Sequence, residues 1–116
     1  MHACGSSTDL IVNKCVENEA DLLIAPCCYG SIRENDEIKY PRSTHYKSFF
    51  NSSFINKISA SNKSSCYHYN LLTSHADRTE KNIEFEESAY LAMSLVDTDR
   101  LLYLRERNYR ECKLFK

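Results

Sequence analysis

Two short segments of the chain hold the side chains best suited to chemistry. The first runs His2-Ala3-Cys4-Gly5 and continues to Thr8-Asp9, and the second runs Pro26-Cys27-Cys28-Tyr29-Gly30. His2 is the only nearby group that titrates around neutrality, so it could act as a general base toward a weakly acidic nucleophile. The alternative is that His2 orients backbone or fills a pocket wall. Tyr29 could stack on a planar ligand or pack in the core.

The cysteines of these segments raise the question of a metal site. Zinc sites prefer thiolates separated by a few residues, and the adjacent Cys27 and Cys28 are poorly spaced to share one ion. Cys66-Tyr67-His68 is too tight as well. Free cysteines are commonly small buried apolar groups, and a reactive thiol needs a lowered pKa that spacing does not reveal. We therefore expect no metal site here.

The elements that would position both segments are a strand, a helix and a second strand. Ser6 and Asp9 resemble a capping box at the start of a helix whose apolar face comes from residues 10–16. Residues 20–26 form a continuous apolar run, which is typical of a strand buried on both faces of a parallel sheet. The carboxyl ends of such strands are where ligands bind in open α/β sheets, so both segments belong to one expected site.

The remaining sequence predicts helices with one closing strand. We expect a loop to about residue 41, an irregular segment at 51–63, and helices at 45–50, 64–76 and 85–108, followed by a strand at 109–115. In the predicted helix at 64–76, Leu71 and Leu72 should point inward. In the predicted helix at 85–108, the inward side chains should be Leu91, Leu95, Val96, Leu102 and Tyr103. Asp97, Asp99 and Arg100 are expected on the solvated face of that helix.

Composition bounds the protein class. The 116 residues suffice for one domain, and a net charge of −1 gives no overall electrostatic footprint for nucleic acid or membrane. Aromatic and basic residues interleave between Tyr40 and Lys57, a pattern that fits a nucleic-acid groove or, as we favour, the docking of a short helix. We find no signal peptide and no run long enough to span a membrane. Six cysteines are too few for a secreted disulfide scaffold, so we expect a reducing, cytoplasmic setting.

The order of these motifs resembles a known family. His-Ala-Cys-Gly, Thr-Asp and then Pro-Cys-Cys-Tyr-Gly look like the methyltransferase domain of the glutathione S-transferase C-terminal domain-containing proteins. Agreement continues through Tyr40-Pro41, residues 76–79, residues 95–100 and Tyr109. A group of tRNA 2'-O-methyltransferases is also similar, but it has Cys-Cys-His-His where this chain has Cys-Cys-Tyr-Gly. This departure argues against methylation of RNA hydroxyl groups.

The resemblance implies an α/β fold, namely a partial doubly wound, Rossmann-like class I methyltransferase domain. Residues 1–116 would be its C-terminal part, with the first strands missing, because doubly wound sheets usually have five or more strands. His2 would be catalytic, and the substrate and cofactor pocket would consist of Ala3, Cys4, Gly5, Thr8, Asp9, Pro26, Cys27, Cys28, Tyr29 and Gly30.

The cofactor implied by the resemblance is S-adenosylmethionine. Its main binding half would precede Met1, so this piece alone should bind the cofactor weakly or not at all and be inactive in isolation. The methyl acceptor stays open among RNA, protein and small molecules, as does the oligomeric state. The alternative is a non-catalytic binding or regulatory module derived from a methyltransferase fold.

Overall fold

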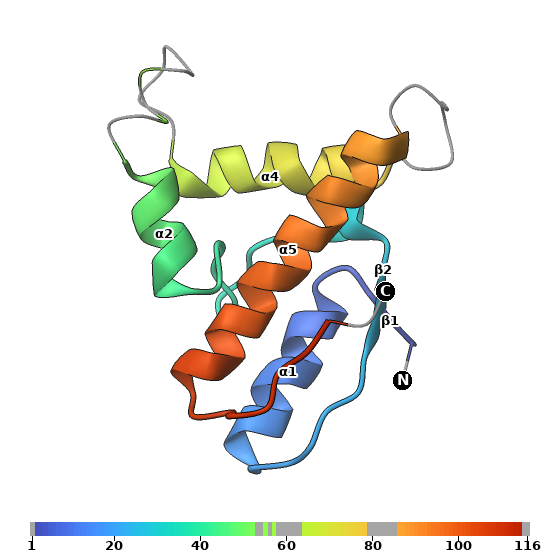
Figure 1. Cartoon of the computed structure of the whole chain (residues 1–116), viewed down its shortest axis with the longest axis vertical. Coiled ribbons are helices and arrows are strands. Elements are labelled where there is room, and N and C mark those ends of the chain that lie inside the picture. The colour runs from blue at the N-terminus through green and yellow to red at the C-terminus, as the bar shows by residue number, and fades with distance from the viewer. Residues whose placement is uncertain (1, 53–54, 56, 58–63, 79–85, 115–116) are drawn as a thin grey trace.

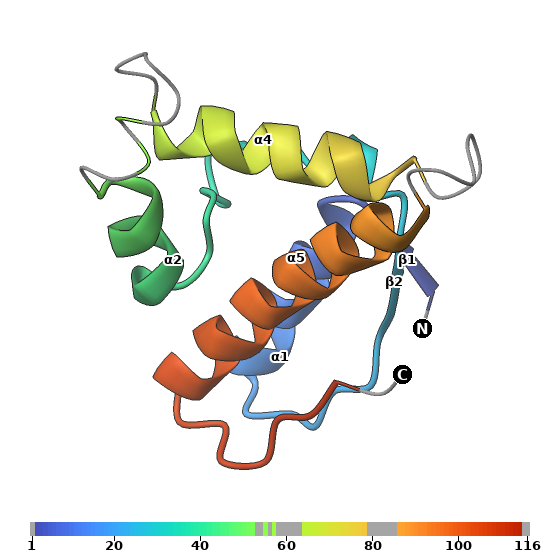
Figure 2. The same cartoon turned by 45° about the horizontal axis from the view of Figure 1, so that its top comes forward.

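The computed structural model describes residues 2–52, 55, 57, 64–78 and 86–114, with only the backbone of residue 2. The elements are, in chain order, β1 (His2–Cys4), α1 (Ser7–Glu17), β2 (Ala25–Cys27), the 3-10 turn η1 (Tyr29–Ser31), α2 (Thr44–Phe50), α4 (Ser65–Ala76) and α5 (Glu86–Glu106). In both views α5 crosses α4 and then runs beside α1, with the β1–β2 pair on one side and α2 on the other (Figure 1, Figure 2).

Helices dominate the described fold, and this corrects the predicted fold class. The predicted strand–helix–strand unit is present, since β1 and β2 pair in parallel, but each strand has only three residues. A doubly wound Rossmann-like sheet buries its strands on both faces. Here the apolar run before β2 lies largely outside the ladder, and Leu23 within it is 77% exposed. The predicted last strand is also wrong as far as residues 109–114 are described, because they form no strand.

The four described α-helices confirm the helical segments that periodicity predicted. Two of them begin at a serine cap: the Ser43 hydroxyl oxygen accepts a hydrogen bond from the Tyr46 N–H, and Ser64 does the same for Tyr67. The predicted capping box of α1 is wrong. The Ser6 hydroxyl makes no cap bond and instead bonds to the backbone of Arg33. The predicted irregular segment 51–63 lies largely outside the described residues.

The hydrophobic core lies where α4, α5 and η1 meet the loop that follows η1. Tyr40 and Tyr69 stack at its centre, with ring centroids 5.2 Å apart. The buried core residues are Tyr29, Ile32, Ile38, Tyr40, Tyr69, Ala76, Ala92 and Val96. Of the predicted inward side chains, Val96 is buried, whereas Leu71, Leu91 and Leu95 are exposed. None of the described helices combines the length and apolar character that a membrane span requires.

Candidate functional site

The carboxyl ends of β1 and β2 bring three cysteines together. Cys4 pairs with Cys27 in the parallel register, and their Sγ atoms are 3.0 Å apart. The Cys28 Sγ lies 3.5 Å from the Sγ of Cys4 and 3.5 Å from that of Cys27. None of the six cysteines of the chain is in a disulfide. We call Cys4, Cys27 and Cys28 the thiol cluster; Cys4 and Cys28 are exposed and Cys27 is half-buried.

Contacts within the cluster separate the acidities of its thiols. Hydrogen bonds from Cys27 first and then Cys28 lower the pKa of Cys4, because they stabilise its thiolate. The hydrogen bond to Cys4, helped by burial, raises the pKa of Cys27 to about 12. The pKa of Cys28 is also raised, chiefly by its hydrogen bond with Cys4. One negative charge is therefore favoured at Cys4 before the others ionise.

Gly5 holds the strand end against η1. Its φ is +51°, a left-handed conformation that side chains disfavour. A Cβ atom there would lie 2.7 Å from the backbone oxygen of Ser31. The Gly5 N–H donates to the Cys27 carbonyl at 3.0 Å, which extends the pairing beyond β1. The glycine thus fixes the distance between the two cysteine-bearing segments.

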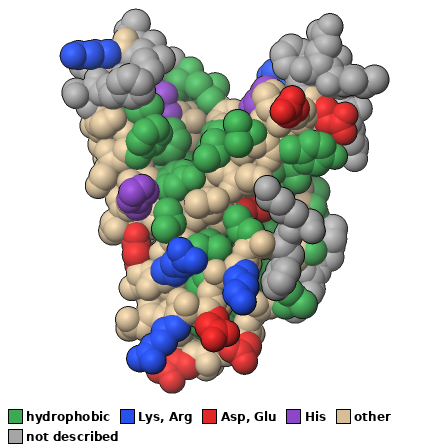
Figure 3. Space-filling model, viewed as in Figure 1, with side chains coloured by type: hydrophobic (Ala, Val, Ile, Leu, Met, Phe, Trp, Pro, Cys, Tyr) green, Lys and Arg blue, Asp and Glu red, His purple; other side chains and the backbone are tan. Residues whose placement is uncertain are grey.

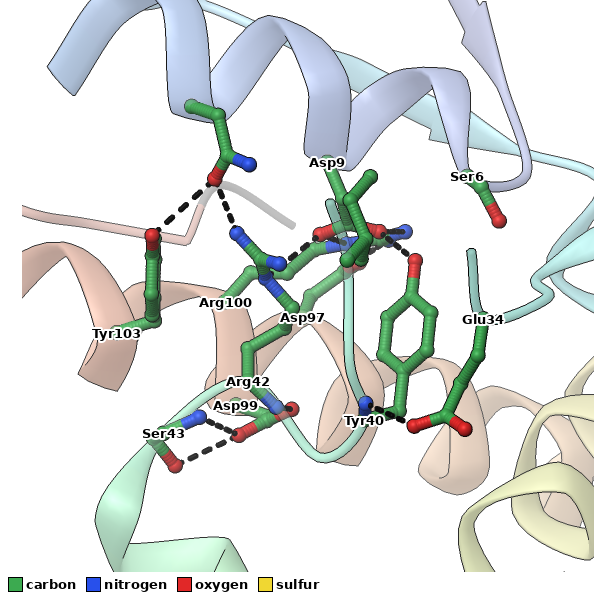
Figure 4. Close-up of polar contacts among 12 residues, drawn as sticks. Ser6, Asp9, Glu34, Tyr40, Arg42, Ser43, Asp97, Asp99, Arg100 and Tyr103 are labelled. Carbon is green, nitrogen blue, oxygen red and sulfur yellow. Dashed lines mark hydrogen bonds and ion pairs between the residues drawn. The ribbon is translucent and has the colours of Figure 1, made fainter. Parts of the chain in front are cut away.

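Asp9, in the first turn of α1, is fully buried. Its Oδ2 accepts hydrogen bonds from the Tyr40 hydroxyl at 2.7 Å and from Arg100 Nη2 at 2.9 Å, and its Oδ1 accepts from Arg100 Nε at 3.1 Å. Figure 4 shows these side chains converging on the carboxylate. Arg42 adds a second guanidinium, with its Nε 3.7 Å from Asp9 Oδ1. The carboxylate joins α1 to α5 and to the loop before α2.

Arg100 extends this network to the strand end. Its Nη1 donates to Asp97 at 3.1 Å and its Nη2 donates to the Gly5 carbonyl at 3.4 Å. Burial opposes the charge of Arg100, but the hydrogen bonds and charge of Asp9 outweigh it, so the pKa of Arg100 is raised further. Asp97 also accepts from the Tyr29 hydroxyl at 2.7 Å, and burial and this contact raise the pKa of Tyr29.

Asp99 makes a second buried junction, between α5 and the start of α2. Its two oxygens accept hydrogen bonds from the backbone N–H groups of Arg42 at 2.7 Å and Ser43 at 2.8 Å. The Ser43 hydroxyl donates to it at 2.6 Å while capping α2. These contacts are also drawn in Figure 4. We call the polar side chains at both junctions the polar brace: Asp9, Tyr40, Arg42, Ser43, Asp97, Asp99 and Arg100.

The predicted pocket residues divide between the cluster and the brace. Gly5, Cys4, Cys27 and Cys28 come together at the strand ends. Asp9 instead faces the interior, and the Thr8 hydroxyl donates to the Ala3 carbonyl at 3.0 Å. These two side chains are buried structural groups.

The other predicted pocket residues have equally local roles. Tyr29 is buried in the core and bonded to Asp97. Ala3 is buried, Pro26 is half-buried, and the Gly30 carbonyl accepts a hydrogen bond from Arg33. The side chain of His2, the predicted catalytic base, lies outside the described residues.

The part of the brace in α5 was not predicted from the sequence, because Asp99 and Arg100 were expected on the solvated face. Both are buried, with Asp99 fully so. A signal was present in the spacing. Asp99 follows Ala92 by seven positions and Val96 by three, which places it on the stripe that faces the core.

Comparison with known proteins gives relatives of one name. The chain is 29% identical over 110 residues to the Glutathione S-transferase C-terminal domain-containing protein homolog of Drosophila melanogaster, covering 95% of this chain and 17% of that protein. It is 29% identical over 111 residues to the Glutathione S-transferase C-terminal domain-containing protein of Mus musculus, covering 94% and 15%. With the protein of that name from Homo sapiens it shares 36% identity over 47 residues, covering 40% and 7%.

These relatives bear out the resemblance only at the level of their name. The chain spans less than a fifth of the length of the curated relatives it matches. Neither a protein-family model nor a solved structure matches it. The names of these relatives mention no methyltransferase, and the described fold is mostly helical with a two-stranded sheet. The description of the chain as a methyltransferase domain with a Rossmann-like fold, which the sequence suggested, is therefore wrong, and a mostly helical fold replaces it.

Proposed function

We propose that this chain is a non-catalytic binding module that docks an apolar face of α4 and α5 onto another part of a longer protein. The observation that carries the proposal is a set of large apolar side chains exposed on these two helices. Leu71 is 54% exposed, Leu91 62% and Leu95 39%, and two tyrosines accompany them, Tyr67 and Tyr90 at 39% and 52%. We call these five residues the apolar face.

Spacing along each helix aligns these side chains. Tyr67 and Leu71 are four residues apart on α4, and so are Leu91 and Leu95 on α5, so each pair lies on one side of its helix. In Figure 3 hydrophobic side chains gather over α4 and the adjoining part of α5, while most Lys and Arg side chains on that face lie below. Exposed apolar side chains gathered on one face of a folded protein mark an interaction site.

The buried side of α5 explains why its large side chains lie outside. The residues that it turns inward include the small Ala89 and Ala92 together with Val96. Small side chains let α5 approach α4 closely, and the core needs no leucine at that crossing. Leu91 and Leu95 therefore do not pack in the core of this segment, and an apolar partner surface would bury them.

The relatives suggest what covers this face. In each of the curated relatives the matching segment makes up less than a fifth of a longer polypeptide. We therefore take the occupant to be an apolar helical surface of the same polypeptide. Burying a leucine that is exposed contributes roughly 1.5–3 kcal/mol, so a few such side chains suffice for stable docking within one chain.

The polar brace supports a non-catalytic role. Asp9 and Asp99 are fully buried and already have partners. Asp9 pairs with the Arg100 guanidinium, and Asp99 accepts hydrogen bonds from the backbone N–H groups of Arg42 and Ser43. Groups used in this way hold elements in place and are shielded from an incoming ligand. Binding of S-adenosylmethionine stays a prediction of the sequence resemblance, and equilibrium dialysis of the chain against labelled cofactor would test it separately.

Self-association of the chain tests the proposal. An uncovered docking face should recruit a second copy, so the mass measured by light scattering should rise with protein concentration. The double variant Leu91→Lys/Leu95→Lys should remain monomeric. Leu23→Lys is the matched control because Leu23 is also an exposed leucine, 77% exposed, but precedes β2 and lies on neither helix.

Two results would overturn this function. One is a chain that stays monomeric at high concentration and does not bind a dye for apolar surfaces. The other is an equal effect of Leu23→Lys and of the double variant. Circular dichroism of each variant would show that its helices are retained.

A further inference from the structure

The thiol cluster has the atoms and the geometry of a metal site. The Sγ atoms of Cys4, Cys27 and Cys28 all lie within 4.8 Å of one another. Thiolate sulfur is the preferred ligand of structural zinc, at about 2.3 Å from the ion. Tetrahedral bonds of that length place two sulfurs about 3.8 Å apart. Small outward shifts of side chains now 3.0 and 3.5 Å apart would therefore admit the ion.

The backbone at Cys28 removes the objection raised by sequence spacing. Adjacent residues in an extended strand point to opposite sides, which would keep Cys27 and Cys28 from sharing an ion. Cys28, however, has φ 53° and ψ 52°, a left-handed conformation that is uncommon outside glycine. This turn at the end of β2 brings both thiols to one point. Strained backbone of this kind persists where the surrounding structure holds it, and it is frequent at functional sites.

The supports of the cluster keep its three sulfurs in place without a ligand. Parallel pairing aligns Cys4 with Cys27, and Gly5 continues that pairing through its N–H bond to the Cys27 carbonyl. Arg100 and Thr8 bind the carbonyls of Gly5 and Ala3 from the interior side. Prearranged ligands of this kind reduce the ordering that metal binding requires.

Access and charge also suit a cation. Cys4 and Cys28 are exposed, so an ion can reach the cluster from solvent. A bound cation favours ionisation of the thiols that surround it. Binding would release the thiol protons to solvent. Three thiolates leave one position of a tetrahedral ion for water or another ligand.

We propose that Cys4, Cys27 and Cys28 bind one Zn²⁺ through three thiolates, at the carboxyl ends of β1 and β2. The site joins the first strand to the segment after the second, so the ion would add a cross-link between residues that are otherwise held by three-residue strands. It is independent of the apolar face on α4 and α5.

Cobalt provides the first test, because thiolate-bound Co²⁺ absorbs visibly and in the near ultraviolet. The whole chain, reduced with a phosphine and freed of metal, should develop thiolate-to-cobalt bands that saturate at one equivalent. Zn²⁺ should bleach them by displacement, and competition with a coloured chelator then gives the Zn²⁺ affinity. No thiolate band, or bands that need more than one equivalent of cobalt, would overturn the site.

Serine variants assign the ligands. Cys4→Ser, Cys27→Ser and Cys28→Ser should each lower Zn²⁺ affinity by more than about tenfold, since even the loss of groups behind metal ligands has roughly that effect. Cys112→Ser is the matched control and should leave the affinity unchanged, because Cys112 lies near the end of the chain and bonds to the Tyr109 carbonyl. Equal losses for Cys112→Ser and Cys28→Ser would show adventitious thiol binding and refute the proposal.

A mass measurement distinguishes the competing chemistry. The closest sulfur pair, Cys4 and Cys27, could instead form a disulfide when an oxidant is present, with loss of two hydrogens. Reduced chain kept with Zn²⁺ in air should retain its thiols, because the ion protects them. If the disulfide between Cys4 and Cys27 forms at the same rate with and without Zn²⁺, metal binding at this site is contradicted.

Discussion

The polar brace and the thiol cluster are linked through the bond of Arg100 to the Gly5 carbonyl, yet they treat polar groups in opposite ways. Asp9 and Asp99 are fully buried and each accepts several hydrogen bonds, whereas Cys4 and Cys28 face solvent. Buried charges are tolerated only when they are paired, so removing one partner is strongly destabilising. Exposed thiols carry no such penalty. The buried polar brace thus contributes stability, whereas the thiol cluster is accessible to ligands.

The largest expected effect is at Asp9. Asp9→Asn keeps the size of the side chain but removes the charge that pairs with Arg100 and faces Arg42. We expect a loss of about 3–5 kcal/mol in the free energy of unfolding, as for other broken buried ion pairs. Denaturant titration followed by circular dichroism measures it. Asp21→Asn, at an exposed aspartate, is the control and should change stability by no more than about 0.5 kcal/mol.

A loss below about 1 kcal/mol for Asp9→Asn would break the comparison, because that is the range of exposed ion pairs. The exposed pair of Lys14 and Glu17, 2.7 Å apart on α1, represents that class in this chain.

The next largest effect is expected at Gly5, which follows Cys4 and accepts a hydrogen bond from Arg100 of the polar brace. Gly5→Ala forces a side chain into a left-handed conformation and against the Ser31 carbonyl, so we expect a loss of about 2 kcal/mol or more. Gly30→Ala is the matched variant. Its new Cβ would lie 2.7 Å from the Asp77 carboxylate, an exposed side chain that can turn away. Equal losses of thermal stability in both variants would show that backbone conformation at Gly5 is unimportant.

A smaller effect distinguishes the two serine caps. Ser43 is buried and bonds to Asp99 as well as capping α2, so Ser43→Ala should lose about 1–2 kcal/mol. Ser64 is exposed and caps α4 with a bond of 3.4 Å, so Ser64→Ala should lose about 0.5 kcal/mol. Paired denaturant titrations give the difference. If Ser64→Ala lowers the free energy of unfolding more than Ser43→Ala does, the bond between Ser43 and Asp99 does not stabilise the fold.

How far the sequence predicted this molecule depends on how local each feature is. The helices were predicted because their periodicity lies within a few turns of chain, and α1, α4 and α5 fall close to the expected limits. The sheet was overestimated because strand pairing is not local. The apolar run at residues 20–26 is compatible with a buried strand, and only the structure shows that β1 pairs with residues 25–27 and leaves most of the run outside the ladder.

The meeting of the two motifs was predicted from the sequence, and their role as a pocket stays a prediction. The two motifs do meet at the strand ends, as parallel strands require. Sequence alone did not separate Asp9, which faces inward, from Cys4, which faces solvent, because both belong to one short motif at the end of β1 and the start of α1. It also missed that a left-handed Cys28 would reverse the effect of adjacent cysteines. The second fact depends on the backbone conformation of one residue.

The smallest expected effect on stability is at Cys4, and here reactivity replaces stability as the measure. Cys4→Ser should change the free energy of unfolding by no more than about 0.5 kcal/mol without metal, because the side chain is exposed. Hydrogen bonds from Cys27 and Cys28 lower the pKa of Cys4 from 9.0, whereas burial raises that of Cys112.

Thiolate is the nucleophile in alkylation, so a lower pKa means a larger reactive fraction near neutral pH. With a chelator present, iodoacetamide should modify Cys4 before Cys112, and the rate at Cys4 should reach half of its plateau below pH 9. Peptide mapping by mass spectrometry at a series of pH values gives both rates. Faster alkylation of Cys112, or a midpoint for Cys4 at or above pH 9, would mean that the cluster does not stabilise a thiolate. The contrast between the polar brace, which holds buried charges, and the thiol cluster, which presents a charge to solvent, would then not hold for the thiol cluster.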